Sequence, residues 1–134
     1  MAEKLASLRK KGGKMSETVL WTNPSPSSGF AAQTLSLSQD IDNFKYLKFV
    51  YGYSTTYNTE HLSFSISVDD FKKCVANNNR SYGLCLTSRN SGNNFTRISF
   101  WVSDTSLSIS NCYQFAGTAS NNNLVIPVQI IGMK

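Results

Sequence analysis

The stretch HLSFSISV, from His61 to Val68, decides the fold class, because apolar and hydroxyl side chains alternate in it without a break. Successive side chains of a β-strand point to opposite faces, so the apolar set should lie on one face and the serines on the other. A strand of this kind is half buried, as in an antiparallel sheet or sandwich. The stretch therefore predicts an all-β protein with four inward-facing side chains, which are Leu62, Phe64, Ile66 and Val68.

Segments on both sides of this stretch repeat the same pattern between polar turns, which predicts eight or nine short strands. They are expected at 18–22, 34–38, 44–51, 61–68, 82–87, 94–102, 106–110, 112–115 and 124–131. A spacing of about 10 to 14 residues, with no βαβ rhythm, is typical of an antiparallel β-sandwich, jelly-roll-like in character. Residues 71–76 stay open between a helical turn and a strand.

Strand hydrophobics predict a single core shared by these strands. Its expected members are Trp21, Leu35, Leu37, Leu47, Phe49, Leu62, Phe64, Ile66, Leu84, Leu86, Ile98, Phe100, Leu107, Ile109, Val125 and Ile126. A chain of 134 residues is the right size for one domain. We expect that domain to span residues 15–134, preceded by a short basic arm.

The arm, residues 1–14, holds +4 of the formal net charge of +5, so the rest of the chain is nearly neutral. Leu5 and Leu8 would share one face of a short helix, which Gly12-Gly13 would end. Helices this short are marginal alone in water, so the arm is either a docking segment that orders on a partner or a flexible tail. Its expected docking residues are Lys4, Leu5, Leu8, Arg9, Lys10, Lys11 and Lys14.

The sequence contains no constellation that would support catalysis or metal binding. The single histidine, His61, has no partners at ligand spacing, and Asp69-Asp70 would point to opposite faces of a strand, so a turn or cap role is expected. Phosphate-binding and nucleophile motifs are missing as well. We expect a protein that is not an enzyme and that has no cofactor and no metal.

Membrane insertion and export are not indicated either, because no apolar run approaches the length of a spanning helix and no signal sequence is recognisable. Three cysteines without a C-x-x-C pair, Cys74, Cys85 and Cys112, indicate buried free thiols made in a reducing cytoplasm.

Four tyrosines lie on or just beyond the strand at 44–51. Tyr46, Tyr51, Tyr53 and Tyr57 could form an exposed row that stacks on sugar rings or anchors a protein interface. The alternative is packing in the core or between subunits, which is the simpler interpretation of an aromatic content of 12%. Under the binding alternative, the glycan or receptor contacts are Tyr51, Tyr53 and Tyr57.

Two ends of the chain resemble the short virion proteins of tailed bacteriophages and related prophages of Firmicutes. These open with an "LWTN...S.FAAQT..L" pattern, continue with a "YKYL.F.Y" strand, and close on an aromatic or aliphatic residue followed by Gly, an apolar residue and Lys. The matching residues are Leu20, Trp21, Thr22, Asn23, Ser28, Phe30, Ala31, Ala32, Gln33, Thr34 and Leu37, then Tyr46 to Tyr51, and finally Ile130, Ile131, Gly132, Met133 and Lys134.

The resemblance implies a non-enzymatic virion structural protein, assembled in the host bacterial cytoplasm. We expect a capsid decoration or head-fibre protein, homotrimeric, anchored to the major capsid protein or another virion protein through the arm. The alternative is a tail-associated module that binds carbohydrate or a host receptor. No membrane or nucleic-acid partner is expected, although the five charges of the arm leave DNA contact as a third alternative.

Two features depart from the family pattern. The arm before Met15 has no counterpart in it and is either an added docking element or an upstream choice of start, and Ile131 stands where the family often has an aromatic residue.

Overall fold

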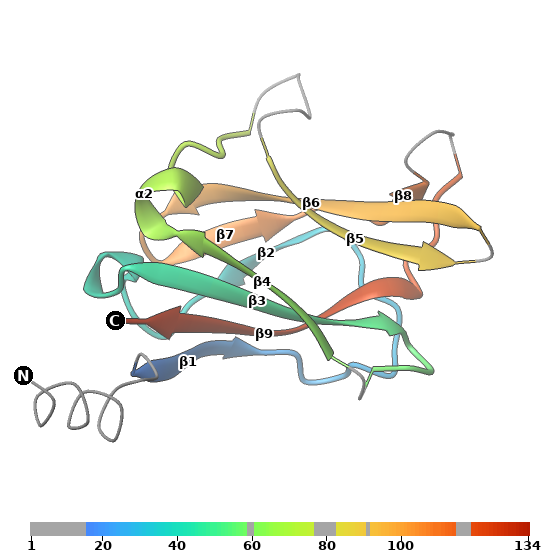
Figure 1. The fold of residues 1–134 in the computed structure, drawn as a ribbon, viewed down its shortest axis with the longest axis horizontal. Coiled ribbons are helices and arrows are strands. Elements are labelled where there is room, and N and C mark those ends of the chain that lie inside the picture. The colour runs from blue at the N-terminus through green and yellow to red at the C-terminus, as the bar shows by residue number, and fades with distance from the viewer. Residues whose placement is uncertain (1–15, 59–60, 77–82, 91, 115–118) are drawn as a thin grey trace, which may run out of the picture.

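A computed structural model describes residues 16–58, 61–76, 83–90, 92–114 and 119–134. It contains two antiparallel sheets packed face to face, which confirms the predicted all-β sandwich (Figure 1). Sheet A has the strand order β1-β9-β3-β4, and sheet B has the order β2-β7-β6-β5 with β8 also paired to β6.

The strands of both sheets are short to medium in length and follow the predicted segments closely. Those of sheet A are β1 (Glu17–Thr22), β9 (Leu124–Met133), β3 (Tyr46–Ser54) and β4 (His61–Ser67). Those of sheet B are β2 (Gln33–Ser36), β7 (Ser106–Ile109), β6 (Asn93–Ser103), β5 (Leu84–Asn90) and β8 (Tyr113–Gln114). Two helical turns complete the described part, η1 (Ile41–Asn43) and α2 (Val68–Phe71).

Residues 71–76, left open between a helical turn and a strand, contain parts of both, because Val75 forms an isolated β-bridge with Trp101 and Phe71 is the last residue of the helical turn α2. Val68 begins it, so the alternating run ends one residue earlier than predicted. Ser67 caps it by accepting a hydrogen bond from the Asp70 amide, and Asp69 and Asp70 occupy its first turn. Acidic residues stabilise that position through the helix dipole, so the expected turn role of this carboxylate pair is confirmed.

The opening and closing segments of the chain are neighbours in sheet A. Strand β1 pairs with β9 from Glu17 opposite Met133 to Thr22 opposite Gln129. Strand β9 pairs in turn with β3, which places Leu47 opposite Gly132. The start of the opening stretch, the β3 segment and the close are therefore three neighbouring strands of sheet A, whereas Gln33 and Thr34 of the opening stretch lie in β2 of sheet B.

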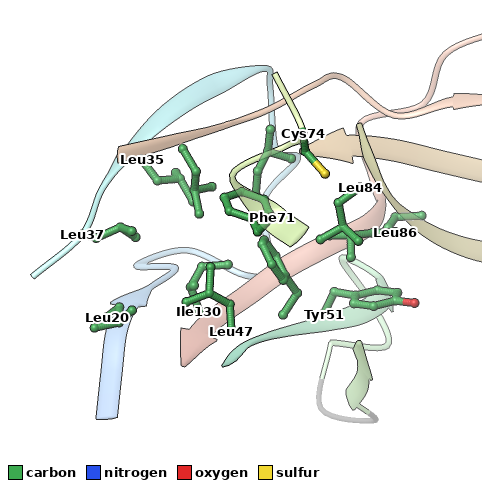
Figure 2. Packing of buried hydrophobic residues seen from close by; sticks show 14 of the residues in the cluster. Leu20, Leu35, Leu37, Leu47, Tyr51, Phe71, Cys74, Leu84, Leu86 and Ile130 are labelled. Carbon is green, nitrogen blue, oxygen red and sulfur yellow. The ribbon is translucent and has the colours of Figure 1, made fainter. Parts of the chain in front are cut away.

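The core lies between the two sheets and draws on both (Figure 2). Phe71 of α2 packs on Phe49 of β3, with ring centroids 5.6 Å apart. Several buried members were not predicted because they lie in turns or beside bulges, where period two is lost. They include Leu20, Phe30, Ile41, Phe44, Phe71 and Ile130.

The prediction that the apolar face of β4 is buried is only partly correct. Phe64 is 44% exposed, while Leu62 and Ile66 are partly buried and pack against the core. Strand β4 is the edge of sheet A and has a neighbour on one side only, so its side chains are covered less than those of β3. Alternation predicted the face of each side chain but not the depth of its burial.

The prediction for β6 is wrong about which face points inward. Ile98 and Phe100 were expected in the core, yet Phe95 and Trp101 pack against it, and Ser99 and Arg97 on the same face are fully buried. The predicted burial of Ile98 is confirmed, since it is 6% exposed, but it lies outside the main core cluster. The inward face of β6 is therefore semi-polar, and its largest member is an arginine.

Arg97 lies at 0% exposure, and its hydrogen bonds to the described residues all go to backbone carbonyl oxygens. Nη1 bonds to Ser110 at 2.9 Å, Nη2 bonds to Asn122 and Leu124 at 3.1 Å each, and Nε bonds to Leu124 at 3.3 Å and also to Val125. No carboxylate of the described residues forms an ion pair with it. Carbonyl dipoles therefore compensate this buried charge.

The guanidinium group also orders the start of β9. Val125 has a φ of 49°, a left-handed conformation that is strained for a β-branched residue. Arg97 bonds to the carbonyl oxygens of Val125 and of the residue before it, which holds this backbone in place. Burial lowers the pKa of Arg97 to about 10, so the group stays charged at neutral pH.

Replacing Arg97 with methionine should leave several buried carbonyl oxygens without a donor. A buried unsatisfied acceptor costs about 1–3 kcal/mol, so Arg97→Met should lower the free energy of unfolding by roughly 3 kcal/mol or more. Urea denaturation measures this difference. The matched control is Arg89→Met on the neighbouring strand β5, where the side chain is exposed and the change should stay within about 0.5 kcal/mol. Equal effects of the two substitutions would refute the structural role of Arg97.

Candidate functional site

The described surface has a cleft of about 460 Å³ where the two sheets open along one side of the sandwich. Strands β4 and β5 are the edge strands of sheets A and B, and the cleft lies between them. One wall comes from Tyr53 and Leu62 of sheet A, and the other comes from Thr87, Ser88, Arg89 and Asn94 of sheet B. The volume falls within the range of small-ligand sites, about 300–1,000 Å³.

The two walls differ in chemistry. Tyr53 and Leu62 supply an aromatic ring and an aliphatic side chain, whereas the opposite wall supplies two hydroxyl groups, a guanidinium and an amide. Tyr53 is 40% exposed, so its ring is available to a ligand. An apolar wall facing a row of hydrogen-bonding groups suits a ligand that has one apolar face and one face with hydrogen-bonding groups.

Tyr51 holds the two walls together and does not line the cleft. It is buried, and its hydroxyl group donates a hydrogen bond to the Thr87 carbonyl oxygen at 3.1 Å, joining β3 to β5. Burial raises the pKa of this hydroxyl, so it remains protonated and able to donate. Of the two interpretations given for the tyrosines, core packing is confirmed for Tyr51, and its place among the direct ligand contacts is wrong.

The remaining tyrosines do not form the row considered from the sequence. Tyr57 is 61% exposed and lies in the turn after β3, where its carbonyl oxygen accepts a hydrogen bond from the Tyr53 amide at 3.2 Å. Tyr46 is exposed at the other end of β3, opposite Met133. Of the four tyrosines, only Tyr53 lines the cleft.

Four lining residues were not identified from the sequence, namely Thr87, Ser88, Arg89 and Asn94. They belong to the β5–β6 hairpin, and Arg89 lies opposite Asn94 in its register. Nothing local in the sequence distinguishes them from ordinary polar residues beside a turn. The register of sheet B and its packing on sheet A bring them to Tyr53.

Carboxylates are unevenly distributed over the described residues. Glu17, Asp40, Asp42, Asp69, Asp70 and Asp104 are the described acidic residues, and they lie at the end of the sandwich where β1 and β3 begin. None of them lines the cleft, whose described lining carries one charged side chain, Arg89. That part of the cleft is accordingly positive.

A cluster of titratable groups surrounds Lys72 at the end of the sandwich away from the cleft. Carboxylate oxygens of Asp40, Asp42 and Asp104 lie within 4.8 Å of one another. The Lys72 ammonium group bridges this cluster by pairing with Asp42 and, at 3.2 Å, with Asp104, whose carboxylate also accepts from Trp101 Nε1 at 3.1 Å. The cluster is thus an ion-pair network that fastens η1, α2 and the β6–β7 turn.

The three cysteines are free, as predicted, but only Cys74 and Cys112 are buried while Cys85 is exposed. Burial raises the pKa of the Cys112 thiol to about 11, so it is neutral at physiological pH. His61 is exposed at the start of β4. The predicted docking residues of the arm, 1–14, lie outside the described residues.

The Lys72 network should stabilise the fold over a defined range of pH. Hydrogen bonding to Lys72 lowers the pKa of Asp104 below its ordinary 3.8, so this contribution is present above that value and is lost on acidification. Hydrogen bonding to Asp42 raises the pKa of Lys72 above 10.5, so the contribution is also lost in strong base.

Lys72→Met should therefore lower the free energy of unfolding between about pH 5 and 10 and have little effect near pH 2. Denaturation across pH measures this profile. The control is Lys73→Met, since Lys73 pairs with Asp70 in a largely exposed position and should show almost no effect at any pH. A Lys72→Met effect that is independent of pH would exclude the ion-pair explanation.

Comparison with known proteins adds no family to this picture. The chain matches no protein-family model, and no curated protein matches its sequence. Among the described residues, no helix has the length and apolar character needed to cross a membrane.

Proposed function

We propose that the chain is a non-enzymatic structural protein of a tailed-phage virion, a capsid decoration or head-fibre protein that docks through residues 1–14. The observation that carries the proposal is the resemblance of the opening, the β3 strand and the close to short phage virion proteins. The start of the opening, β3 and the close are neighbouring strands of sheet A and form one structural unit, while Gln33 and Thr34 of the opening lie in β2 of sheet B.

The shared residues have structural roles in this unit. Asn23 is buried and donates to the Pro127 carbonyl oxygen at 2.8 Å, which ties the turn after β1 to β9. Gly132 leaves room for the Phe44 ring, because a Cβ at this position would lie 2.6 Å from it. Lys134 Nζ lies 5.9 Å from the centre of the same ring. The pattern is therefore a signature of the fold, and the partner-binding surface lies elsewhere.

The start of the described chain and the cleft lie towards opposite ends of the sandwich, which suits a module docked at one end. The Lys134 amide bonds to the Ser16 carbonyl oxygen at 3.1 Å, so Ser16, two residues after the arm, lies at the end where β3 begins. Tyr53 and the cleft lie towards the other end of β3, a strand of nine residues that spans roughly 25 Å. Docking through the arm would leave the cleft facing away from the capsid.

Each docking contact is expected to be weak, because a short basic segment must lose entropy to become ordered. A symmetric trimer presents three arms to a repeating capsid surface, and the contacts then add through effective concentration. The positive arm fits an acidic partner surface, and its binding should weaken as salt increases.

Deleting residues 1–14 should abolish co-sedimentation with capsids of the phage or prophage that encodes the chain. The deletion variant should keep its thermal unfolding midpoint and its trimer mass in light scattering, because the sandwich is left intact. Tyr53→Ala in the full chain is the matched control and should sediment normally. Unchanged co-sedimentation of the deletion variant would refute docking through the arm.

A second candidate function, binding of carbohydrate or a host receptor, is favoured by the cleft. Its walls offer an exposed aromatic ring and four polar side chains at the end opposite the proposed docking segment. The two functions are compatible within one virion protein, because they use different parts of the chain.

A further inference from the structure

The cleft carries enough chemistry to assign a class of ligand to it. Its described lining combines one aromatic ring, one aliphatic side chain, two hydroxyls, an amide and a guanidinium, without a carboxylate. We propose that this cleft binds a saccharide unit that bears an acidic group, either a carboxylate or a phosphate. The inference deepens the second candidate function, on which it rests, and does not depend on docking through the arm.

The aromatic wall accounts for recognition of a sugar ring. One face of a pyranose carries C–H groups, and such a face packs on an aromatic ring much as other apolar groups do. Tyr53 offers this ring, and Leu62, from the adjacent strand β4, extends the apolar wall. A ligand without an apolar face would leave this wall exposed to water.

The polar wall accounts for recognition of hydroxyl groups and of the acidic group. Thr87, Ser88 and Asn94 can donate and accept hydrogen bonds, which suits sugar hydroxyls that do both. Arg89 is exposed and forms no ion pair with a described carboxylate. Its planar fork matches a carboxylate or phosphate, and such charge-assisted bonds are stronger than neutral ones.

The architecture provides a preformed site for this ligand. The Tyr51 hydroxyl bonds to the Thr87 carbonyl oxygen and joins the two sheets beside the cleft. Arg89 and Asn94 lie opposite each other in the β5–β6 register, so the cation and the amide are held on neighbouring strands. A site built on paired strands loses little entropy when a ligand binds.

Calorimetric titration of the full chain with defined probes tests the inference. The acidic probes are tetragalacturonic acid and glucose 6-phosphate, the neutral counterparts are its methyl ester and glucose, and inorganic phosphate is the non-sugar probe. At least one acidic sugar should bind roughly tenfold tighter or more than its neutral counterpart and than inorganic phosphate. Which acidic sugar binds then distinguishes carboxylate from phosphate.

Variants of the chain separate the two walls. Arg89→Gln should remove the preference for the acidic sugar, and Tyr53→Ala should weaken binding of both acidic and neutral sugars while Tyr53→Phe retains it. Lys73→Gln, which removes one exposed cation at the other end of the sandwich, is the charge-matched control and should bind normally.

Three outcomes would overturn the inference: no binding of any probe, equal binding of acidic and neutral sugars, or inorganic phosphate binding as tightly as the sugar phosphate. None of these outcomes changes the co-sedimentation result, so failure at the cleft and failure of capsid docking remain distinguishable.

Discussion

The fold depends on a buried, charged guanidinium group whose hydrogen bonds to the described residues all go to backbone carbonyl oxygens. Arg97 projects from β6 of sheet B and bonds to Leu124 and Val125 at the start of β9 in sheet A. It also bonds to Ser110 and Asn122 in the segments between β7 and β9. All these acceptors are backbone groups. The arginine therefore fixes the backbone of the segments that carry them, whatever side chains those segments have.

The segment from Trp21 to Phe30 packs against the same guanidinium group. The Phe30 ring centre lies 5.1 Å from the Arg97 guanidinium carbon, and the Phe30 amide bonds to the same Asn122 carbonyl oxygen that Arg97 uses. Trp21 packs edge-on against Phe30 at 6.1 Å. Phe30 of this stretch thus lies against the buried cation, and Trp21 packs in turn on Phe30.

The sequence predicted the strands well where alternation of apolar and polar residues alone decides which side chains are buried. It failed where a polar side chain has its hydrogen-bond partners inside the sandwich. Strict alternation located β4 and β7, and proline-rich and asparagine-rich stretches located the turns. In β6 the rule reversed the faces, because Arg97 meets its hydrogen-bonding needs inside the sandwich and Ile98 is covered on the outside. Tyr53 was named from the sequence as a possible ligand contact, but the cleft itself could not be predicted, since Tyr53 and Arg89 are brought together only by the packing of one sheet on the other.

The most direct test of this account is the hydrogen exchange of arginine side chains followed by NMR. The Nε–H of Arg97 should exchange with solvent as slowly as the backbone amides of β6 and β9, because it is buried and bonded to backbone carbonyl oxygens. Arg89 in the same sample provides the exposed reference. An Arg97 signal that exchanges as fast as that of Arg89 would contradict the claim that this guanidinium organises the fold.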